Sequence, residues 1–84
     1  MRWETVRETY PNQWLLFEAI DAVSDNGKRV INELSVLNTY DSGRDALGGY
    51  KELHHKEPKR ELYVAHSSKK NLDIIEQKWH GIRV

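Results

Sequence analysis

Hydrophobic and polar residues alternate most clearly in the first half of the chain. Residues 14–23 begin as a continuous apolar run and then alternate, which predicts a strand buried on both faces at its start and on one face near its end. Residues 29–40 also alternate clearly. One face of this second strand is expected to carry Val30, Leu34 and Val36, with Asn32 as an interruption.

Between these two segments lies Asn26-Gly27. Asn-Gly is the strongest short-range hairpin signal, because both residues tolerate the positive φ angles that a tight turn needs. The pattern therefore predicts a β-hairpin of two strands, each of about ten residues.

A helical period of apolar residues occurs twice. Over Arg2 to Thr9, Trp3 and Val6 fall on one face of a short helix, with Tyr10 one turn further and Pro11 as the stop signal. The second helix is expected to begin at Ser42, whose hydroxyl can cap free N–H groups, with Asp45 completing a capping box. Its apolar stripe comprises Ala46, Leu47, Tyr50, Leu53 and His54.

The second helix is expected to close at Glu57-Pro58. Within it, Gly48-Gly49 costs about 1 kcal/mol per glycine relative to alanine. A close approach of the helix to the sheet or to a partner is the expected compensation.

Two further strands are predicted in the last third of the chain. Residues 61–66 have strand composition, and a polar turn follows over 67–71. Residues 72–79 also read as a strand, although a helix over 71–77 competes because Leu72, Ile75 and Trp79 fit a period of 3.6. The adjacent isoleucines favour the strand.

These elements predict one α+β domain over residues 1–84, in the order α-β-β-α-β-β. Its expected architecture is a mainly antiparallel four-stranded sheet, with the main helix packed on one face and a short helix at the N-terminus. The 84 residues are enough for one domain to fold without disulfides.

The composition indicates a cellular compartment and argues against several kinds of site chemistry. The chain has no cysteine, which excludes disulfides, thiolate zinc sites and cysteine nucleophiles and fits a reducing cytoplasm. The first residues carry no apolar leader, and no apolar run is long enough to span a bilayer. We therefore expect a cytoplasmic protein without membrane contact.

Charge is balanced over the whole chain but is unevenly distributed. Residues 1–27 hold two basic and five acidic residues, a net charge of −3, whereas residues 51–70 hold six basic and three acidic residues, a net charge of +3. Such a dipole can orient two copies head to tail or mark an anion-facing patch.

No catalytic, metal-binding or cofactor-binding motif is found. His54 and His55 are adjacent and diverge on a helix, so they cannot chelate one ion together, and no histidine pair has the i, i+4 spacing of a helical metal site. The serines lack a nucleophile elbow, and the glycines match no phosphate loop. We therefore expect no enzyme activity and no cofactor.

Two binding functions remain. The first is a protein-binding or homodimerising module that associates through a strand edge and through aromatic residues near the chain ends, namely Trp3, Tyr10 and Trp79. The alternative is weak nucleic-acid binding by the basic segment 51–70, through Lys51, Lys56, Lys59, Arg60, Lys69 and Lys70.

Short motifs at both ends and in the middle of the chain are similar to motifs of known proteins. The start Tyr10-Pro11-Asn12-Gln13-Trp14 and the end Trp79-His80-Gly81-Ile82-Arg83 resemble those of a group of small bacterial proteins of unassigned function. Residues 50–54 and 60–64 are similar to theirs as well. The resemblance implies a domain of unknown function and supplies no catalytic or ligand residues.

Overall fold

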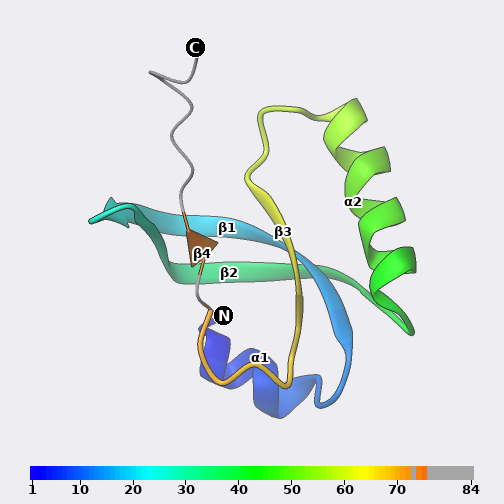
Figure 1. Ribbon diagram of the computed structural model, residues 1–84, viewed down its shortest axis with the longest axis horizontal. Helices are drawn as coiled ribbons and strands as arrows, with labels where there is room; N and C mark the ends of the chain where they lie inside the picture. The colour runs from blue at the N-terminus through cyan, green and yellow to red at the C-terminus, as the bar shows by residue number, and fades with distance from the viewer. Residues whose placement is uncertain (73, 76–84) are drawn as a thin grey trace.

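The computed structural model describes residues 1–72, 74 and 75 (Figure 1). Two helices and three main strands follow one another in the order α-β-β-α-β, and a two-residue strand comes after them. Their bounds are α1 Trp3–Thr9, β1 Trp14–Asp25, β2 Lys28–Tyr40, α2 Gly43–Lys56, β3 Leu62–His66 and β4 Ile74–Ile75.

The long hairpin is confirmed. Strands β1 and β2 pair antiparallel from Trp14 opposite Tyr40 to Asp25 opposite Lys28. The turn uses Asn26 at φ 50° and Gly27 at φ 78°, the left-handed region that these two residue types tolerate. The other helices and strands pack on this hairpin or pair with its edges.

Strand β3 lies on the other side of β1. It pairs antiparallel with the first five residues of β1, from Trp14 opposite His66 to Glu18 opposite Leu62. The main sheet therefore has the order β3-β1-β2, and β4 pairs with Lys28 and Arg29 on the outer edge of β2.

The prediction of a four-stranded sheet in the order α-β-β-α-β-β is wrong, because the sheet has three full antiparallel strands. Of the predicted strand over 72–79, only Ile74–Ile75 pairs, and residues 73 and 76–79 lie outside the described part. The chain after β3 is instead held to α1: the Trp3 indole donates to the Lys69 carbonyl at 2.9 Å, and Arg7 Nε donates to the Ser67 carbonyl at 3.1 Å. These bonds lie in the predicted turn over 67–71, and they lead the chain across α1 to the outer edge of β2.

Three irregularities in the hairpin decide which side chains share a face. The register between β1 and β2 shifts beside Leu37, Ile20 and Asn32, so each of these residues is an extra residue in its strand. Below the Asn32 bulge, Ile31 packs on the core together with Leu34. Val30 consequently lies on the opposite face, and the prediction that it shares a face with Leu34 and Val36 is wrong.

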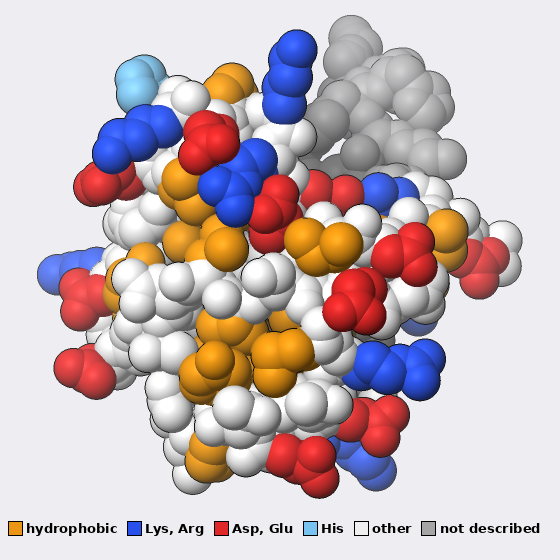
Figure 2. Space-filling view, turned by 180° about the vertical axis from the view of Figure 1, so that it is seen from behind, with side chains coloured by type: hydrophobic (Ala, Val, Ile, Leu, Met, Phe, Trp, Pro, Cys, Tyr) orange, Lys and Arg blue, Asp and Glu red, His pale blue; other side chains and the backbone are white. Residues whose placement is uncertain are grey.

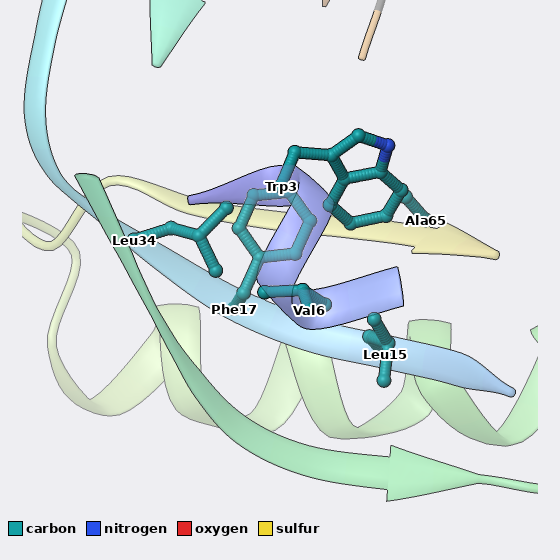
Figure 3. Packing of buried hydrophobic residues seen from close by; sticks show 6 residues of the cluster. All are labelled: Trp3, Val6, Leu15, Phe17, Leu34 and Ala65. Atoms are coloured by element: carbon teal, nitrogen blue, oxygen red, sulfur yellow. The ribbon is translucent and has the colours of Figure 1, made fainter. Parts of the chain in front are cut away.

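The hydrophobic core lies between α1 and one face of the sheet (Figure 3). Its buried members are Trp3, Val6, Leu15, Phe17, Leu34 and Ala65. The ring centroids of Phe17 lie 6.1 Å from that of Trp3 and 5.8 Å from that of Tyr63. The seven-residue helix α1 is thus the main cover of the core.

Helix α2 lies on the other face of the sheet, behind the strands in Figure 3. Ser42 caps it as expected, with its hydroxyl accepting from the Asp45 N–H at 3.1 Å, and the helix ends at Lys56. Ala46 is its only buried residue, whereas Tyr50 and Leu53 are half-buried. The longer helix therefore covers its face of the sheet incompletely.

The two helical glycines face different surroundings. A methyl group at Gly48 would meet nothing within 4 Å, so Gly48→Ala should raise the free energy of unfolding by about 1 kcal/mol through helix propensity. At Gly49 it would overlap the hydroxyl of Tyr40 and approach its Cζ to 2.7 Å. We expect Gly49→Ala to be less stable than Gly48→Ala by about 1–3 kcal/mol in urea unfolding. Equal stability of the two variants would show that Tyr40 moves aside at no cost.

Candidate interaction surfaces

The face of the sheet that carries α2 presents an apolar surface to solvent. Four large aliphatic residues on it, here called the aliphatic stripe, are 59%, 50%, 40% and 51% exposed: Ile20, Val23, Val30 and Leu47. Hydrophobic side chains reach the surface across the middle of the molecule in the view from behind (Figure 2). Strand alternation and the bulge at Ile20 place the three hairpin residues on the α2 side, away from the closed core.

An ion pair lies on the same face of the sheet as the aliphatic stripe. Arg60 donates to Glu18 at 2.6 Å and to Glu57 at 3.1 Å. The hydrogen bond from Arg60 lowers the pKa of the Glu18 carboxyl, against a smaller opposing effect of burial. Glu18 therefore stays ionised well into mild acid, and the pair ties the start of β3 to β1.

A second charged network lies on the core face. Arg29 donates to the two oxygens of Glu61 at 2.7 and 2.8 Å, and the Tyr63 hydroxyl donates to Glu61 at 2.6 Å. The hydrogen bond from Arg29 lowers the pKa of Glu61, and burial, followed by the bond to Glu61, raises the pKa of Tyr63 to about 12. This network joins β2 to the start of β3 across β1.

Two carboxylates of like charge face each other on the hairpin. Asp21 of β1 lies directly opposite Glu33 of β2, on the face away from Leu34 and the core. Directly opposite like charges on neighbouring strands are destabilising. Glu33 is held by the N-terminal ammonium of Met1 at 2.5 Å, whereas Asp21 is exposed and makes no ion pair among the described residues. Asp21 is therefore the uncompensated acidic group at this end of the aliphatic stripe.

Two of the three aromatic residues that were proposed as interface anchors are described by the structure, and both pack in or against the core. Trp3 is only 9% exposed and is a core residue, so its ring has little surface to offer a partner. Tyr10 is half-buried and packs against the core. Trp79 lies outside the described residues.

The six basic residues of segment 51–70 do not gather at one place. Lys51 and Lys56 are exposed on α2, and Lys59 and Arg60 precede β3. Lys69 and Lys70 follow β3, so the full length of that strand separates them from Lys59 and Arg60 (Figure 1). Arg60 is also held by two carboxylates, and Lys56 lies 3.9 Å from Glu52.

Two of the histidines, His54 and His66, take part in local ring contacts. The rings of His54 and Tyr50 stack, with centroids 5.5 Å apart, and His66 meets the Trp14 ring edge-on at 5.1 Å. Within the described part of the chain, no three His, Asp or Glu side chains are arranged to hold a metal ion. Neither α1 nor α2 is long and apolar enough to cross a membrane.

Residue patterns did not identify the aliphatic stripe, because its members look like core positions of a strand and a helix. The Asn32 interruption was the one available signal, since a bulge there turns Val30 to the other face. Comparison of the chain with protein-family models, with curated proteins and with solved structures finds no match.

Proposed function

We propose that this chain is a non-enzymatic association module that forms a homodimer in the cytoplasm through the face that carries α2. The aliphatic stripe is the observation that carries the proposal. Large aliphatic side chains that gather on one exposed face often mark a surface that meets a partner or a ligand. Ile20, Val23 and Val30 lie on the paired part of β1 and β2, so a partner would meet a preformed surface there.

A second copy fits this face better than an unrelated protein because its two ends carry opposite charge. The hairpin end presents Asp21, and the α2 end presents Lys51 and Lys59, none of which makes a salt bridge among the described residues. In a two-fold dimer with antiparallel hairpins, the acidic end of each copy lies against the basic end of its partner. A lysine of the second copy that approaches Asp21 and Glu33 would reduce the repulsion between these two carboxylates.

Sedimentation equilibrium over a range of concentrations tests the dimer. We expect the wild-type protein to dimerise, and Ile20→Lys to raise the dimer Kd by about tenfold or more, because a buried interface charge is costly. The matched control is Thr5→Lys, which adds the same charge at an exposed position of α1. The control should dimerise like wild type.

A second variant separates association from folding. Asp21→Lys replaces the like-charge pair with an attractive one, so the monomer should be at least as stable as wild type in urea. The dimer should nevertheless weaken, because the acidic end of the surface is lost. A wild-type protein that stays monomeric at high micromolar concentration would remove the proposal, and so would equal effects of Ile20→Lys and Thr5→Lys.

A further inference from the structure

The two edges of the main sheet differ in how they are covered. On the edge formed by β2, Ile74 pairs with Arg29, and the Leu34 N–H donates to the Met1 carbonyl at 2.8 Å. Strand β3 forms the opposite edge, and its outer side has no strand partner in the described part of the chain. An uncovered edge can accept a further strand, so β3 is the place where one could be added.

The hydrogen bonds between β1 and β3 show which backbone groups of β3 face outward. The Ala19 N–H donates to the Glu61 carbonyl at 2.9 Å, and the Ser67 N–H donates to the Gln13 carbonyl at 2.9 Å. Hydrogen-bonded positions alternate along an antiparallel pair, so the odd-numbered residues of β3 also bond to β1. The even-numbered residues therefore turn their backbone groups away from the sheet.

Leu62, Val64 and His66 are these outward-facing positions. Their N–H groups, and the carbonyls of Leu62 and Val64, make no hydrogen bond within the described part of the chain. The His66 carbonyl accepts from the Lys69 N–H at 3.1 Å. An extended peptide that adds to a sheet pairs with donors and acceptors spaced in this way, two residues apart.

An apolar pocket opens beside this edge, between α2 and β3. Its volume is about 270 Å³. It is lined by Leu47, Tyr50, Leu62, Tyr63 and Val64. The Tyr50 ring stacks on His54 with centroids 5.5 Å apart, which fixes one wall of the pocket. Val64 and the residue opposite it in an added strand would point to the same face of the sheet, so the pocket can take an apolar side chain of that strand.

Uncompensated positive charge flanks β3 on both sides. Lys59 lies before the strand and Lys69 follows it by one turn, and both are exposed and make no salt bridge in the described part of the chain. Between them, Arg60 is neutralised by Glu18 and Glu57. An added strand with an apolar residue in its middle and acidic residues at both ends would therefore complement this edge.

The same charges disfavour a second copy at the β3 edge. A two-fold pairing of β3 with itself through all its outward groups is centred on Val64, and it would place Lys59 opposite the partner's Lys69. Like charges directly opposite each other are destabilising, and this contact would occur twice. From the open edge, the pocket and the flanking lysines, we infer that β3 binds an extended acidic peptide segment of another protein by strand addition.

The inference goes beyond the proposed dimer and does not rest on it. Of the described residues, Leu47 alone belongs to both the pocket and the aliphatic stripe, and Lys59 also lies at the basic end of the dimer surface. Peptide binding is therefore measured on Ile20→Lys, which weakens the dimer at a position outside the pocket. A peptide that fails to bind leaves the dimer standing, and a wild-type protein that stays monomeric leaves the peptide test unaffected.

Isothermal titration calorimetry with the peptide acetyl-Glu-Glu-Thr-Leu-Thr-Glu-Glu-amide is the test. We expect saturable binding of one peptide per chain. With leucine opposite Val64 in antiparallel register, the leucine N–H donates to the Val64 carbonyl, so the N-methyl-leucine peptide should bind about tenfold more weakly. The peptide with lysine in place of every glutamate should show no saturable binding, because its charges repel those at both ends of β3.

Variants of the edge locate the contact. Val64→Pro removes an outward N–H without taking a hydrogen bond from the β1–β3 pair, and proline is tolerated at such edge positions. It should raise the peptide Kd by about tenfold or more, whereas the matched control Val64→Thr keeps the N–H and should bind within about twofold of the parent. Circular dichroism should show that both variants fold.

A pair of charge variants tests the acidic preference. Lys59→Glu/Lys69→Glu should reverse the preference, so that the lysine peptide binds more tightly than the glutamate peptide. Arg2→Glu/Lys28→Glu makes the same change in net charge at exposed positions outside β3 and should keep the preference for the glutamate peptide.

Three results would overturn the inference: no saturable binding of the acidic peptide at millimolar concentration, equal weakening by Val64→Pro and Val64→Thr, or amide chemical shift changes centred away from residues 62–66. Two other occupants would also contradict it. If Ile20→Lys still dimerises and adding Val64→Pro abolishes that dimer, the edge pairs with a second copy. If a synthetic peptide of residues 76–84 binds more tightly than the acidic peptide, the edge belongs to the chain's own end.

Discussion

Phe17→Ala should remove a large part of the protein's free energy of unfolding. Phe17 is fully buried at the centre of the core, between Trp3 of α1 and Tyr63 of β3. Truncating a buried phenylalanine costs about 3–5 kcal/mol, because apolar contact is lost and a cavity remains. A chain of 84 residues has a total stability of about 4–12 kcal/mol, so this loss consumes a large part of it.

Thermal unfolding followed by circular dichroism measures the effect, and we expect the Tm to fall by about 15 °C or more. Val23→Ala is the control in the same strand, since Val23 is half exposed on the other face and its truncation should cost about 0.5 kcal/mol or less. A Phe17→Ala protein as stable as Val23→Ala would mean that the core is not centred on this ring.

The hairpin was predictable because its signals are local. Alternation over residues 14–40 and one Asn-Gly pair specify two strands and the turn between them, and both turn residues do adopt positive φ. The α2 start was predictable for the same reason, since the Ser42 cap and Asp45 lie within one turn.

The faces of the hairpin were less predictable, since one inserted residue reverses every side chain beyond it. Three bulges occur in this hairpin. The one at Asn32 puts a polar residue where the alternation expects an apolar one, and the one at Leu37 follows directly on the apolar Val36. The bulge at Ile20 adds an apolar residue to an apolar pattern, so nothing in the sequence marks it. The exposed aliphatic stripe depends on these bulges.

The hydrophobic patterns of the two helices could not predict which of them covers the core. The apolar stripe of α2 is longer than that of α1, which favours α2 as the cover of the core. Burial depends instead on which face of the sheet is apolar, and Leu15, Phe17 and Ala65 all point towards α1. Strand pairing over long sequence distances decides this, and local periodicity carries no information about it.

The placement of the basic residues shows the same limit for the candidate sites. Counting charge along the sequence groups neighbours, and it therefore selected segment 51–70. Arg2, Lys28 and Lys70 are separated by 26 and 42 positions and meet only because the chain after β3 crosses α1 and reaches the edge of β2. Such a cluster requires the topology, which composition does not provide.

Trp3→Ala should be nearly as damaging as Phe17→Ala, although Trp3 lies in a helix of only seven residues. The indole is almost completely buried against Phe17, and its N–H donates to the Lys69 carbonyl at 2.9 Å. Truncation therefore costs about 3–5 kcal/mol of core packing, and it also releases the segment after β3 from α1. An isolated helix of this length is unstable in water, so α1 itself should unfold in the variant.

Two further variants show which contact matters, with urea unfolding followed by circular dichroism as the measurement. Trp3→Phe keeps an aromatic ring and removes the indole N–H, so it should cost less than Trp3→Ala by about 2 kcal/mol. Leu47→Ala on α2 should be close to neutral in the monomer, because Leu47 is half exposed and alanine favours the helix. If Leu47→Ala proved as costly as Trp3→Ala, then α2 rather than α1 would be the helix that closes the core.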